Sequence, residues 1–231
     1  IVMEAKDIEK ALELCLDMQY RKDRLAYQID GMVIKVNRFD QQEILGATGR
    51  APKWCISYKF PAEQAETVVE SIDVQVGKTG TLTPVANLKP VQLAGTTVKR
   101  ATLHNFDYLE QLDLHEGDRV LIEKAGEIIP QVIEVTTPDP EREKLNLTPF
   151  KAPIICPVCK TKVKVIKRKR TGKKQDIKEK SEFTHTYKCV NPECPAVVKE
   201  KIIYFVGKGQ MDIENVGPSL IEQLIARKLI K

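Results

Sequence analysis

The stretch Ile-Asp-Gly-Met-Val-Ile-Lys-Val, residues 29–36, is an apolar, strand-forming run with a lysine near its end. A second run of the same kind, Trp-Cys-Ile-Ser-Tyr-Lys-Phe-Pro, occupies residues 54–61 and also carries a lysine near its end. Runs of this length and composition predict buried strands. A buried ammonium group without a partner is costly, and lysine is among the residues least often fully buried. We therefore ask which anion Lys35 and Lys59 face.

Alternation along the two strands places each lysine beside small or modest side chains. Successive side chains point to opposite faces, so Lys35 shares a face with Gly31, and Lys59 shares one with Ser57. Side by side, these faces would form a cleft with two cations at its floor, which suits a phosphate-containing ligand. Asp30 could pair with a lysine or help to hold a metal or a ribose. The alternative is that both lysines reach water from sheet edges, with their stems packed on apolar neighbours.

Length and composition indicate a soluble globular protein. The 231 residues suffice for two or more compact units. No apolar run approaches the roughly 18 residues of a membrane span. The N-terminal IVMEAKDIEK has neither a basic nor an apolar leader region, so we expect no signal peptide and a piece cut from a longer chain.

The net charge of +5 is unevenly distributed. Residues 151–201 contain 15 Lys and Arg against 5 Asp and Glu, whereas the remainder contains 22 basic and 27 acidic residues. A basic block on a slightly acidic chain indicates a polyanionic partner for that block. The alternative is a solvated, lysine-rich loop.

The pattern of the chain changes several times along its length. Residues 4–24 have helical spacing. Short β runs separated by Gly and Pro, from about 67 to 136, predict a small barrel. The polar, proline-bearing segment 136–149 is typical of a linker. Residues 199–231 predict helices, with a helix, glycine turn and helix in MDIENVGPSLIEQLIARKLIK.

Four of the six cysteines form two close pairs, Cys156 with Cys159 and Cys189 with Cys194. This usage indicates a reduced compartment and a metal rather than a disulfide framework. Close spacing lets both thiolates of a pair point at one ion, and four thiolates satisfy tetrahedral zinc. We expect a structural zinc with no open coordination position. A redox pair at Cys156-Pro-Val-Cys159 would not explain the second pair.

The quoted strands resemble a known family. IDGMVIKVN and WCISYKFPAE are similar to motifs IV and V of the nucleotidyltransferase domain of the bacterial-type NAD-dependent DNA ligases. The resemblance continues through QVGKTGTLTPVANLKPV, GTTVKRATLHNFD, GDRVLIEKAGEIIPQV, the cysteine pairs and MDIENVGPSLIEQL, and covers essentially the whole chain. It matches Asp30 and Lys35 to motif IV and Lys59 to motif V. In that family these positions line the adenylate pocket, with the lysines on phosphate.

The chain departs from the family pattern at two points. The family's covalent nucleophile is a lysine in Lys-x-Asp-Gly, and no such tetrapeptide occurs in these residues. We therefore expect a fragment that begins after the nucleophile and is inactive alone. The family usually has arginine eight positions before the motif IV aspartate, where this chain has Lys22, with Arg21 beside it.

The resemblance implies a multidomain α+β protein. Its expected parts are the C-terminal part of an adenylation (nucleotidyltransferase) domain at 1–66, an OB-fold domain at 67–140, a linker at 141–150, a four-cysteine zinc finger with a basic insertion at 151–198, and the start of a helix-hairpin-helix domain at 199–231.

Three turns of the expected barrel combine cations with small or polar residues, at 77–81, 99–105 and 124–127. OB folds bind nucleic acid on one sheet face and its flanking loops. Ordinary turn chemistry with solvated charges would give the same pattern. The resemblance favours a duplex-binding surface, with Lys78, Arg100 and Lys124 as the best candidates.

The segment between the cysteine pairs, 160–188, is longer than the family leads us to expect. It contains VKVIKRKRTGKKQDIKEK, which predicts an inserted basic hairpin or a mobile loop. Charge alone suggests that Lys167, Arg168, Lys169 and Arg170 hold the DNA backbone. The alternative is solvation of these charges.

The implied function is the sealing of nicks in duplex DNA during replication and repair. The parent would transfer AMP from NAD to its own lysine and then to a 5′-phosphate, which the 3′-hydroxyl attacks. Mg²⁺ or Mn²⁺ would offset charge. The expected partners are NAD and nicked duplex DNA, and we expect a monomer in the bacterial cytoplasm without membrane association. The alternatives are a non-catalytic nucleic-acid-binding OB and zinc-finger module, and an ATP- or GTP-using relative. The finger and the MDIENVGPSLIEQL segment argue against the relative.

Overall fold

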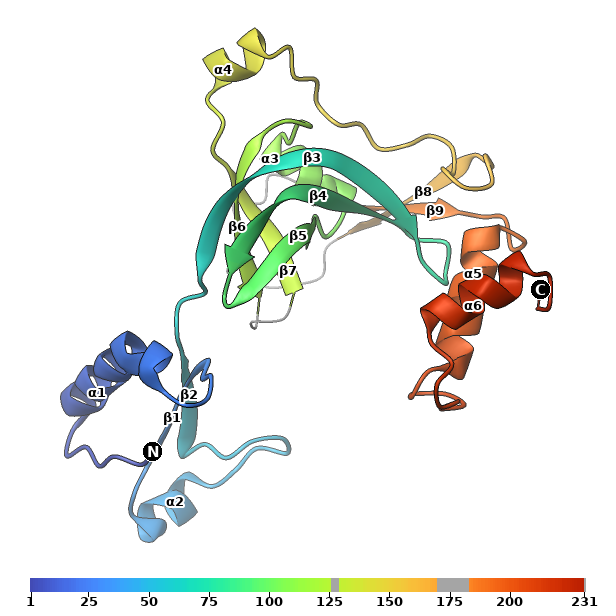
Figure 1. Ribbon diagram of the computed structural model, residues 1–231. Coiled ribbons are helices and arrows are strands. Elements are labelled where there is room, and N and C mark those ends of the chain that lie inside the picture. Colours follow the sequence, from blue (N-terminus) through green and yellow to red (C-terminus); the bar gives the residue numbers. More distant parts are fainter. Residues whose placement is uncertain (126–128, 170–182, 231) are drawn as a thin grey trace. The chain divides into compact units, whose positions relative to one another are not determined.

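The computed structural model describes residues 1–125, 129–169 and 183–230 (Figure 1). The chain divides into two compact units, Ile1–Glu63 and Gln64–Lys231, and each is described by itself. Within the described ranges, no helix combines the length and the apolar character needed to cross a membrane.

The first unit consists of one long helix, a shorter helix and a two-stranded ribbon. Its elements are α1 (Ile8–Arg21), the 3₁₀ turn η1 (Lys22–Arg24), β1 (Gly31–Lys35), α2 (Phe39–Leu45) and β2 (Cys55–Lys59). The Asp7 side chain caps α1 by accepting a hydrogen bond from the main-chain N–H of Lys10 at 2.7 Å. Cys15 and Met18 of α1 are buried, and the helix packs against β1. The predicted helix at 4–24 is thus present as α1 and η1.

The prediction that the two quoted strands are buried is wrong. Among the residues that the structure describes, β1 and β2 pair only with each other, and Val33 and Ile56 are 57% and 67% exposed. Continuous apolar runs are typical of strands covered on both faces. α1 packs against β1, but much of the apolar surface of the ribbon remains open.

The second unit is built on a closed five-stranded barrel. Its strands, in the order β3-β4-β5-β7-β6 around the barrel, are β3 (Gln64–Val76), β4 (Leu82–Leu93), β5 (Thr96–Thr102), β6 (Arg119–Ala125) and β7 (Ile129–Val135). A parallel pairing of Thr102 with Gln131 closes the ring. Alternate residues of β4 from Leu82 to Leu88 point into the core, as expected for strands with one buried face. The predicted OB-fold barrel is confirmed.

A short helix, α3 (Phe106–Leu112), connects β5 to β6. The Asn105 side chain caps it by accepting a hydrogen bond from the N–H of Tyr108 at 2.8 Å. The sequence pattern did not predict this helix, because seven residues give only two turns of periodicity.

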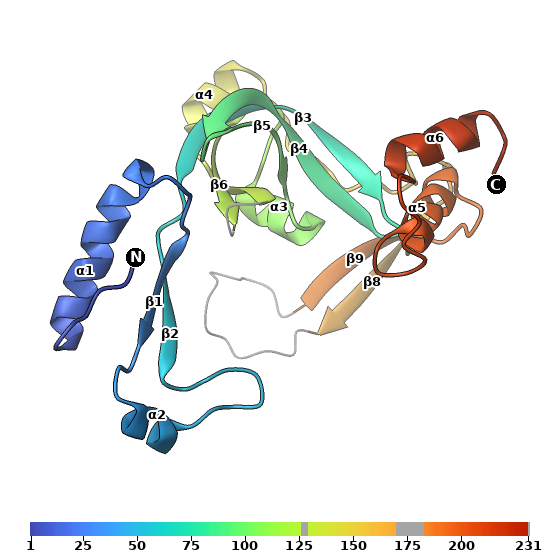
Figure 2. The ribbon, with the colours of Figure 1, turned by 60° about the horizontal axis from the view of Figure 1, so that its bottom comes forward.

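The cysteine-bearing segment forms a ribbon followed by two helices (Figure 2). Its elements are β8 (Val163–Lys169), β9 (Phe183–Cys189), α5 (Pro195–Val206) and α6 (Pro218–Ala226). The expected basic hairpin is present as far as Lys169, and Arg170 lies outside the described residues. The predicted helix after Gly217 is confirmed as α6. The predicted helix before that glycine is wrong, because residues 211–217 contain no helix and the preceding helix, α5, ends at Val206.

The barrel and the cysteine-bearing segment share a second hydrophobic core. Val76, Leu82 and Phe106 from the barrel side pack with Val163 and Val197 from the other side, together with Cys156, Cys189 and Cys194. Phe150 packs against both this core and the barrel core. The cysteine-bearing segment is therefore packed onto one end of the barrel.

The polar segment expected as a linker is fastened to the barrel. It contains α4 (Asp139–Lys144), whose Arg142 donates two hydrogen bonds to the fully buried Asp118, at 2.9 and 2.7 Å. Asp118 also accepts from the N–H of His115 at 2.8 Å. The hydrogen bonds between Arg142 and Asp118 raise the pKa of Arg142. A buried carboxylate is tolerated when it is paired and hydrogen-bonded in this way.

Candidate nucleotide and metal sites

The pairing of β1 with β2 places both motif lysines on one face of the ribbon. Gly31 lies opposite Lys59, Val33 opposite Ser57, and Lys35 opposite Cys55. Directly opposed residues of an antiparallel pair project from the same face. The predicted sharing of faces is confirmed, and four residues of strand, or ~13 Å, separate the two lysines along the ribbon.

Gly31 leaves room for Lys59 and lets the two strands approach closely. A Cβ at residue 31 would lie 2.3 Å from the carbonyl oxygen of Tyr58 and 3.0 Å from the Cα of Lys59. No side chain therefore stands opposite Lys59 on its own face of the ribbon. The sequence argument noted the small residue but not the backbone contact that requires it.

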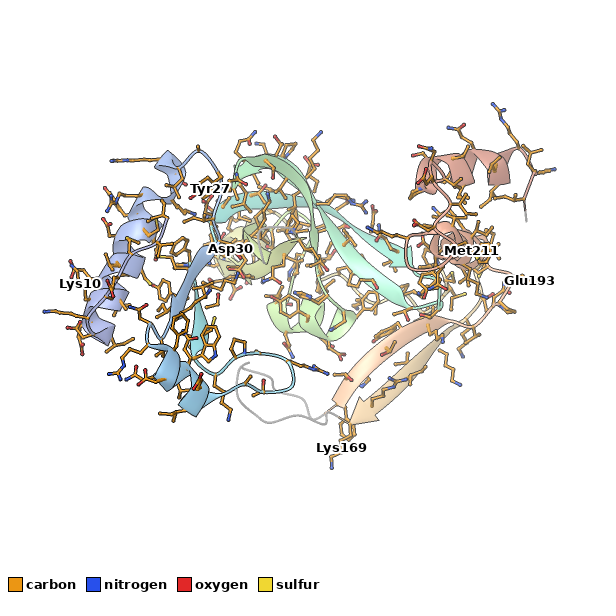
Figure 3. The ribbon with its side chains drawn as sticks, turned by 90° about the horizontal axis from the view of Figure 1, so that it is seen from below. Lys10, Tyr27, Asp30, Lys169, Glu193 and Met211 are labelled. Atoms are coloured by element: carbon orange, nitrogen blue, oxygen red, sulfur yellow. The ribbon has the colours of Figure 1, made fainter. Side chains whose placement is uncertain are left out.

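Asp30 directly precedes β1 (Figure 3). It forms an ion pair with Lys59. The hydrogen bond from Lys59 lowers the pKa of the Asp30 carboxyl group. Both side chains are well exposed, at 49% for Asp30 and 64% for Lys59. Lys35 is exposed as well and makes no ion pair within the described residues. The ribbon thus presents one free ammonium group and one held by a carboxylate.

Lys22 stands where the family usually has arginine, and it contacts Glu63, the last residue of the same unit. Its Nζ lies 2.6 Å from Oε1 of Glu63, and its side chain is 18% exposed. The neighbouring Arg21 pairs with Asp17 one helical turn back. The two cations at this position therefore have different partners.

The four paired cysteines converge into one cluster. Their Sγ atoms all lie within 4.8 Å of one another, with Cys156 and Cys194 at 3.9 Å and Cys159 and Cys189 at 3.5 Å. Ligands about 2.3 Å from a tetrahedral zinc lie roughly 3.8 Å from one another. The cluster therefore has the donor set and the spacing of a closed four-thiolate site.

The thiols of this cluster differ in acidity. Hydrogen bonding with Thr161, whose hydroxyl oxygen is 3.3 Å from the sulfur, lowers the pKa of Cys159 to about 6. Burial raises the pKa of Cys189 to about 12 and also raises that of Cys194. A metal that binds all four as thiolates must displace protons from the buried thiols.

The three candidate DNA-binding cations differ in accessibility. Lys78, in the β3–β4 turn, has its Nζ 2.9 Å from the ring centroid of Tyr204 on α5. Arg100 is half-exposed and 3.8 Å from Asp73. Lys124 is only 8% exposed and donates a hydrogen bond to the Thr96 hydroxyl. Gly126 and Glu127 of the same turn lie outside the described residues.

The β3–β4 turn contacts the cysteine cluster directly. Cys189 donates its main-chain N–H to the carbonyl oxygen of Gly80 at 2.8 Å. A Cβ at residue 80 would lie 2.2 Å from the carbonyl oxygen of Cys189. At Gly80 the close neighbour is therefore the protein's own backbone.

An Asp–His pair that the sequence did not reveal also joins β9 to the barrel end. Asp107 of α3 accepts from the N–H of His185 at 2.6 Å and lies 2.9 Å from its Nδ1. Phe106 and Tyr187 pack edge to face beside it, with ring centroids 4.7 Å apart. The residues of each pair are about eighty positions apart in the chain, so no local spacing could show them.

Known family models match the first unit and part of the second. A model of the NAD-dependent DNA ligase adenylation domain matches residues 1–63, and a model of the NAD-dependent DNA ligase OB-fold domain matches residues 66–144. The first match contains the β1–β2 ribbon, and the second contains the barrel.

Curated relatives align with the chain from end to end. A protein named DNA ligase from Solibacter usitatus is 44% identical over 223 residues, which cover 96% of this chain and 31% of that protein. A DNA ligase from Natranaerobius thermophilus is 44% identical over 230 residues (100% and 32%), and one from Thermotoga maritima is 45% identical over 226 (98% and 30%). The chain spans about a third of the length of these relatives. With its adenylation-domain ribbon, its OB-fold barrel and its four-cysteine cluster, the chain belongs to the NAD-dependent DNA ligase family.

Proposed function

We propose that the protein containing this chain is an NAD-dependent DNA ligase. It seals nicks in duplex DNA by joining a 5′-phosphate to a 3′-hydroxyl through an adenylate intermediate, in replication and repair. The register of β1 with β2 carries the proposal, because it sets Lys35 and Lys59 on one exposed face with Asp30 beside them.

Each of these three residues has a role toward phosphate. Lys35 and Lys59 contact phosphates of NAD and of the adenylate, and preplaced cations stabilise charge that develops during transfer. Asp30 orients Lys59. A lysine that stabilises phosphate charge acts as a cation, whereas a nucleophilic lysine must lose its proton, so neither of these two lysines is the attacking group. That group belongs to a Lys-x-Asp-Gly motif, which these 231 residues do not contain.

Two kinds of metal ion enter the proposal. Cys156, Cys159, Cys189 and Cys194 hold a structural zinc, supported by their sulfur spacing and by the absence of an open position in a four-thiolate shell. Mg²⁺ or Mn²⁺ offsets phosphate charge in reactions of this class.

The remaining proposals concern organisation and partners. We propose domain boundaries near residues 66, 140, 150 and 198, with a helix-hairpin-helix domain beginning near 199. Duplex DNA binds the barrel surface that carries Lys78 and Arg100, and Lys124, being buried, is the least accessible of the three candidates. The protein acts as a monomer in the bacterial cytoplasm.

The test is the intact mass of the full-length protein after incubation with magnesium and either NAD or ATP. An AMP-sized increment with NAD alone supports the proposal. An increment with ATP assigns the protein to another ligase class, and no increment with either favours a non-catalytic DNA-binding module.

A further inference from the structure

The four clustered cysteines differ in how far solvent reaches them. Cys156 and Cys194 are fully buried and Cys189 is 3% exposed, whereas Cys159 is partly exposed. Cys159 lies in a turn, and Val158 beside it is exposed. A small oxidant in solution therefore reaches the sulfur of Cys159 before those of the other three.

A second thiol lies within reach of Cys159. The Sγ atom of Cys159 is 3.5 Å from that of Cys189, which belongs to the other cysteine pair. Cys156 and Cys194, which also come from different pairs, have their Sγ atoms 3.9 Å apart. The two sulfurs of a disulfide lie about 2 Å apart, so either contact needs a shift of only about 1.5–2 Å to form the bond. The contacts favour disulfides between the two pairs.

We propose that Cys159 and Cys189 form a redox modification site, at which hydrogen peroxide converts the two thiolates into a disulfide and zinc is released. This inference rests on the proposed zinc site. It goes beyond that site, because a metal held in a closed four-thiolate shell has a structural role and no chemistry of its own.

The oxidation consists of two displacements at sulfur and oxygen. The Cys159 thiolate attacks one oxygen of the peroxide, so that an S–O bond forms, the O–O bond breaks, and the departing hydroxide is protonated to water. The Cys189 thiolate then attacks the sulfur of the resulting sulfenic acid, so that an S–S bond forms and a second hydroxide leaves and is protonated. The two sulfurs give up two electrons in total, and the peroxide is reduced to two waters. Cys156 and Cys194 then offer two thiolates in place of four, which is too few for a closed zinc shell.

The position of the disulfide decides what happens to the β8–β9 ribbon. Cys189 ends β9 opposite Val163 of β8, and its main-chain N–H is bonded to Gly80 of the barrel. A bond from Cys159 to Cys189 joins the two cysteine pairs as the metal does, so the base of the ribbon stays closed after zinc is lost. A bond from Cys156 to Cys159 would leave the two pairs unlinked.

Disulfide mapping of the zinc-loaded 231-residue chain, after treatment with about one equivalent of hydrogen peroxide, tests the site. Trypsin separates the two cysteine pairs onto different peptides, residues 152–160 and 189–199. A bond between the pairs therefore links the two peptides, and fragmentation of the linked product identifies the bonded sulfurs. We expect Cys159 joined to Cys189, with about one zinc ion released per disulfide, as measured with a chelating dye. A bond from Cys156 to Cys159 as the main product, or no disulfide, would overturn the proposal.

Cys55→Ser is the matched control, because Cys55 is also partly exposed but lies on β2, outside the cluster. This variant should give the same linked peptides and the same zinc release as the wild-type chain. Loss of both in the variant would place the reactive thiol outside the cluster and overturn the proposal.

Reversibility gives a second measurement on the wild-type chain. A thiol reductant together with zinc should restore the metal content, because a disulfide is reversible whereas sulfinic and sulfonic acids are not restored by thiols. Permanent loss of zinc binding would show that peroxide drives Cys159 past the disulfide, against the proposal.

The zinc content before oxidation separates this inference from the proposals on which it rests. A chain that contains no zinc but still forms the Cys159–Cys189 bond removes the metal and leaves the modification site. A zinc-loaded chain that resists peroxide removes the modification site alone. Neither result depends on AMP transfer from NAD.

Discussion

At the scale of single residues, two glycines are required by what faces them. Gly31 and Gly80 both stand against a carbonyl oxygen of a neighbouring strand, at Tyr58 and Cys189. Gly80 in addition has a φ of +81°, which L side chains rarely adopt. Both glycines are visible in the sequence as candidate special positions, but the atoms that exclude a side chain are not.

Gly80→Ala should destabilise the second unit. Positive φ for a non-glycine residue costs on the order of 1–3 kcal/mol, and the added Cβ would also displace the Cys189 backbone. We expect a loss of about 2 kcal/mol or more in urea unfolding of the whole chain. Gly209→Ala is the control, because nothing lies within 4 Å of a Cβ there. Equal effects of the two substitutions would show that the contact between Gly80 and Cys189 does not exclude a side chain.

Replacement of either motif lysine should affect activity far more than stability. In the full-length protein, Lys35→Ala and Lys59→Ala should each slow AMP incorporation from NAD by about 10²–10³-fold, the usual effect of removing one charge-stabilising donor. The Lys59–Asp30 pair is exposed, so the free energy of unfolding should change little.

Lys53→Ala, at an exposed position in the same unit, is the matched control for both lysines. A loss of AMP incorporation equal to that of the control would show that Lys35 and Lys59 do not belong to the adenylate-binding site. A large loss of stability without a change in rate would make their role structural.

At the scale of elements, alternation was the most reliable guide. It predicted which side of each strand carries Lys35 and Lys59, and the β1–β2 register confirms this. The apolar composition of the two runs was wrong about burial, because burial depends on what covers a strand and not on the strand itself. Cover comes from distant segments, which a local period does not specify.

The segment carrying α4 illustrates the same limit. Its polar residues and prolines are typical of a linker, yet Arg142 is bonded to Asp118, 24 residues earlier. The bond is between buried side chains, with 11% and 0% of their surfaces exposed. Although the segment is polar in sequence, its Arg142–Asp118 bonds are one of its main attachments to the barrel.

Removal of either partner should be strongly destabilising. Arg142→Met and Asp118→Asn should each lower the unfolding free energy by about 3–5 kcal/mol, because each leaves a buried polar group unpaired. The double variant should cost less than the sum of the two. Lys144→Met, on the exposed side of the same helix, is the control. Urea unfolding measures all four variants, and single effects below about 1 kcal/mol would contradict the assignment.

At the scale of the whole molecule, the sequence predicted the barrel, the cysteine cluster and the family. These features depend on local periodicity or on short spacings such as Cys156 to Cys159. The shared second core was not predicted, since it joins Val76 and Leu82 to residues near position 190. The contact of Lys78 with Tyr204 is of the same kind.

Removal of zinc should loosen the end of the barrel as well as the finger. Cys156, Cys189 and Cys194 belong to the core that contains Val76 and Leu82. After chelation, amide exchange should accelerate at these two barrel residues and remain slow at Val120 and Val132 in the barrel core. Exchange that is unchanged at Val76 and Leu82 after confirmed metal loss would show that the two cores are independent.

The shared core also has a consequence for synthesis on the ribosome. Leu82 is made 112 residues before Cys194, the last of the four cysteines. At about 5–20 residues per second, the exposed end of the β3–β4 hairpin waits roughly 6–22 s for the partners that cover it. During that interval the nascent barrel has an uncovered apolar tip, which makes it a candidate client for chaperones until the metal-binding segment emerges and docks.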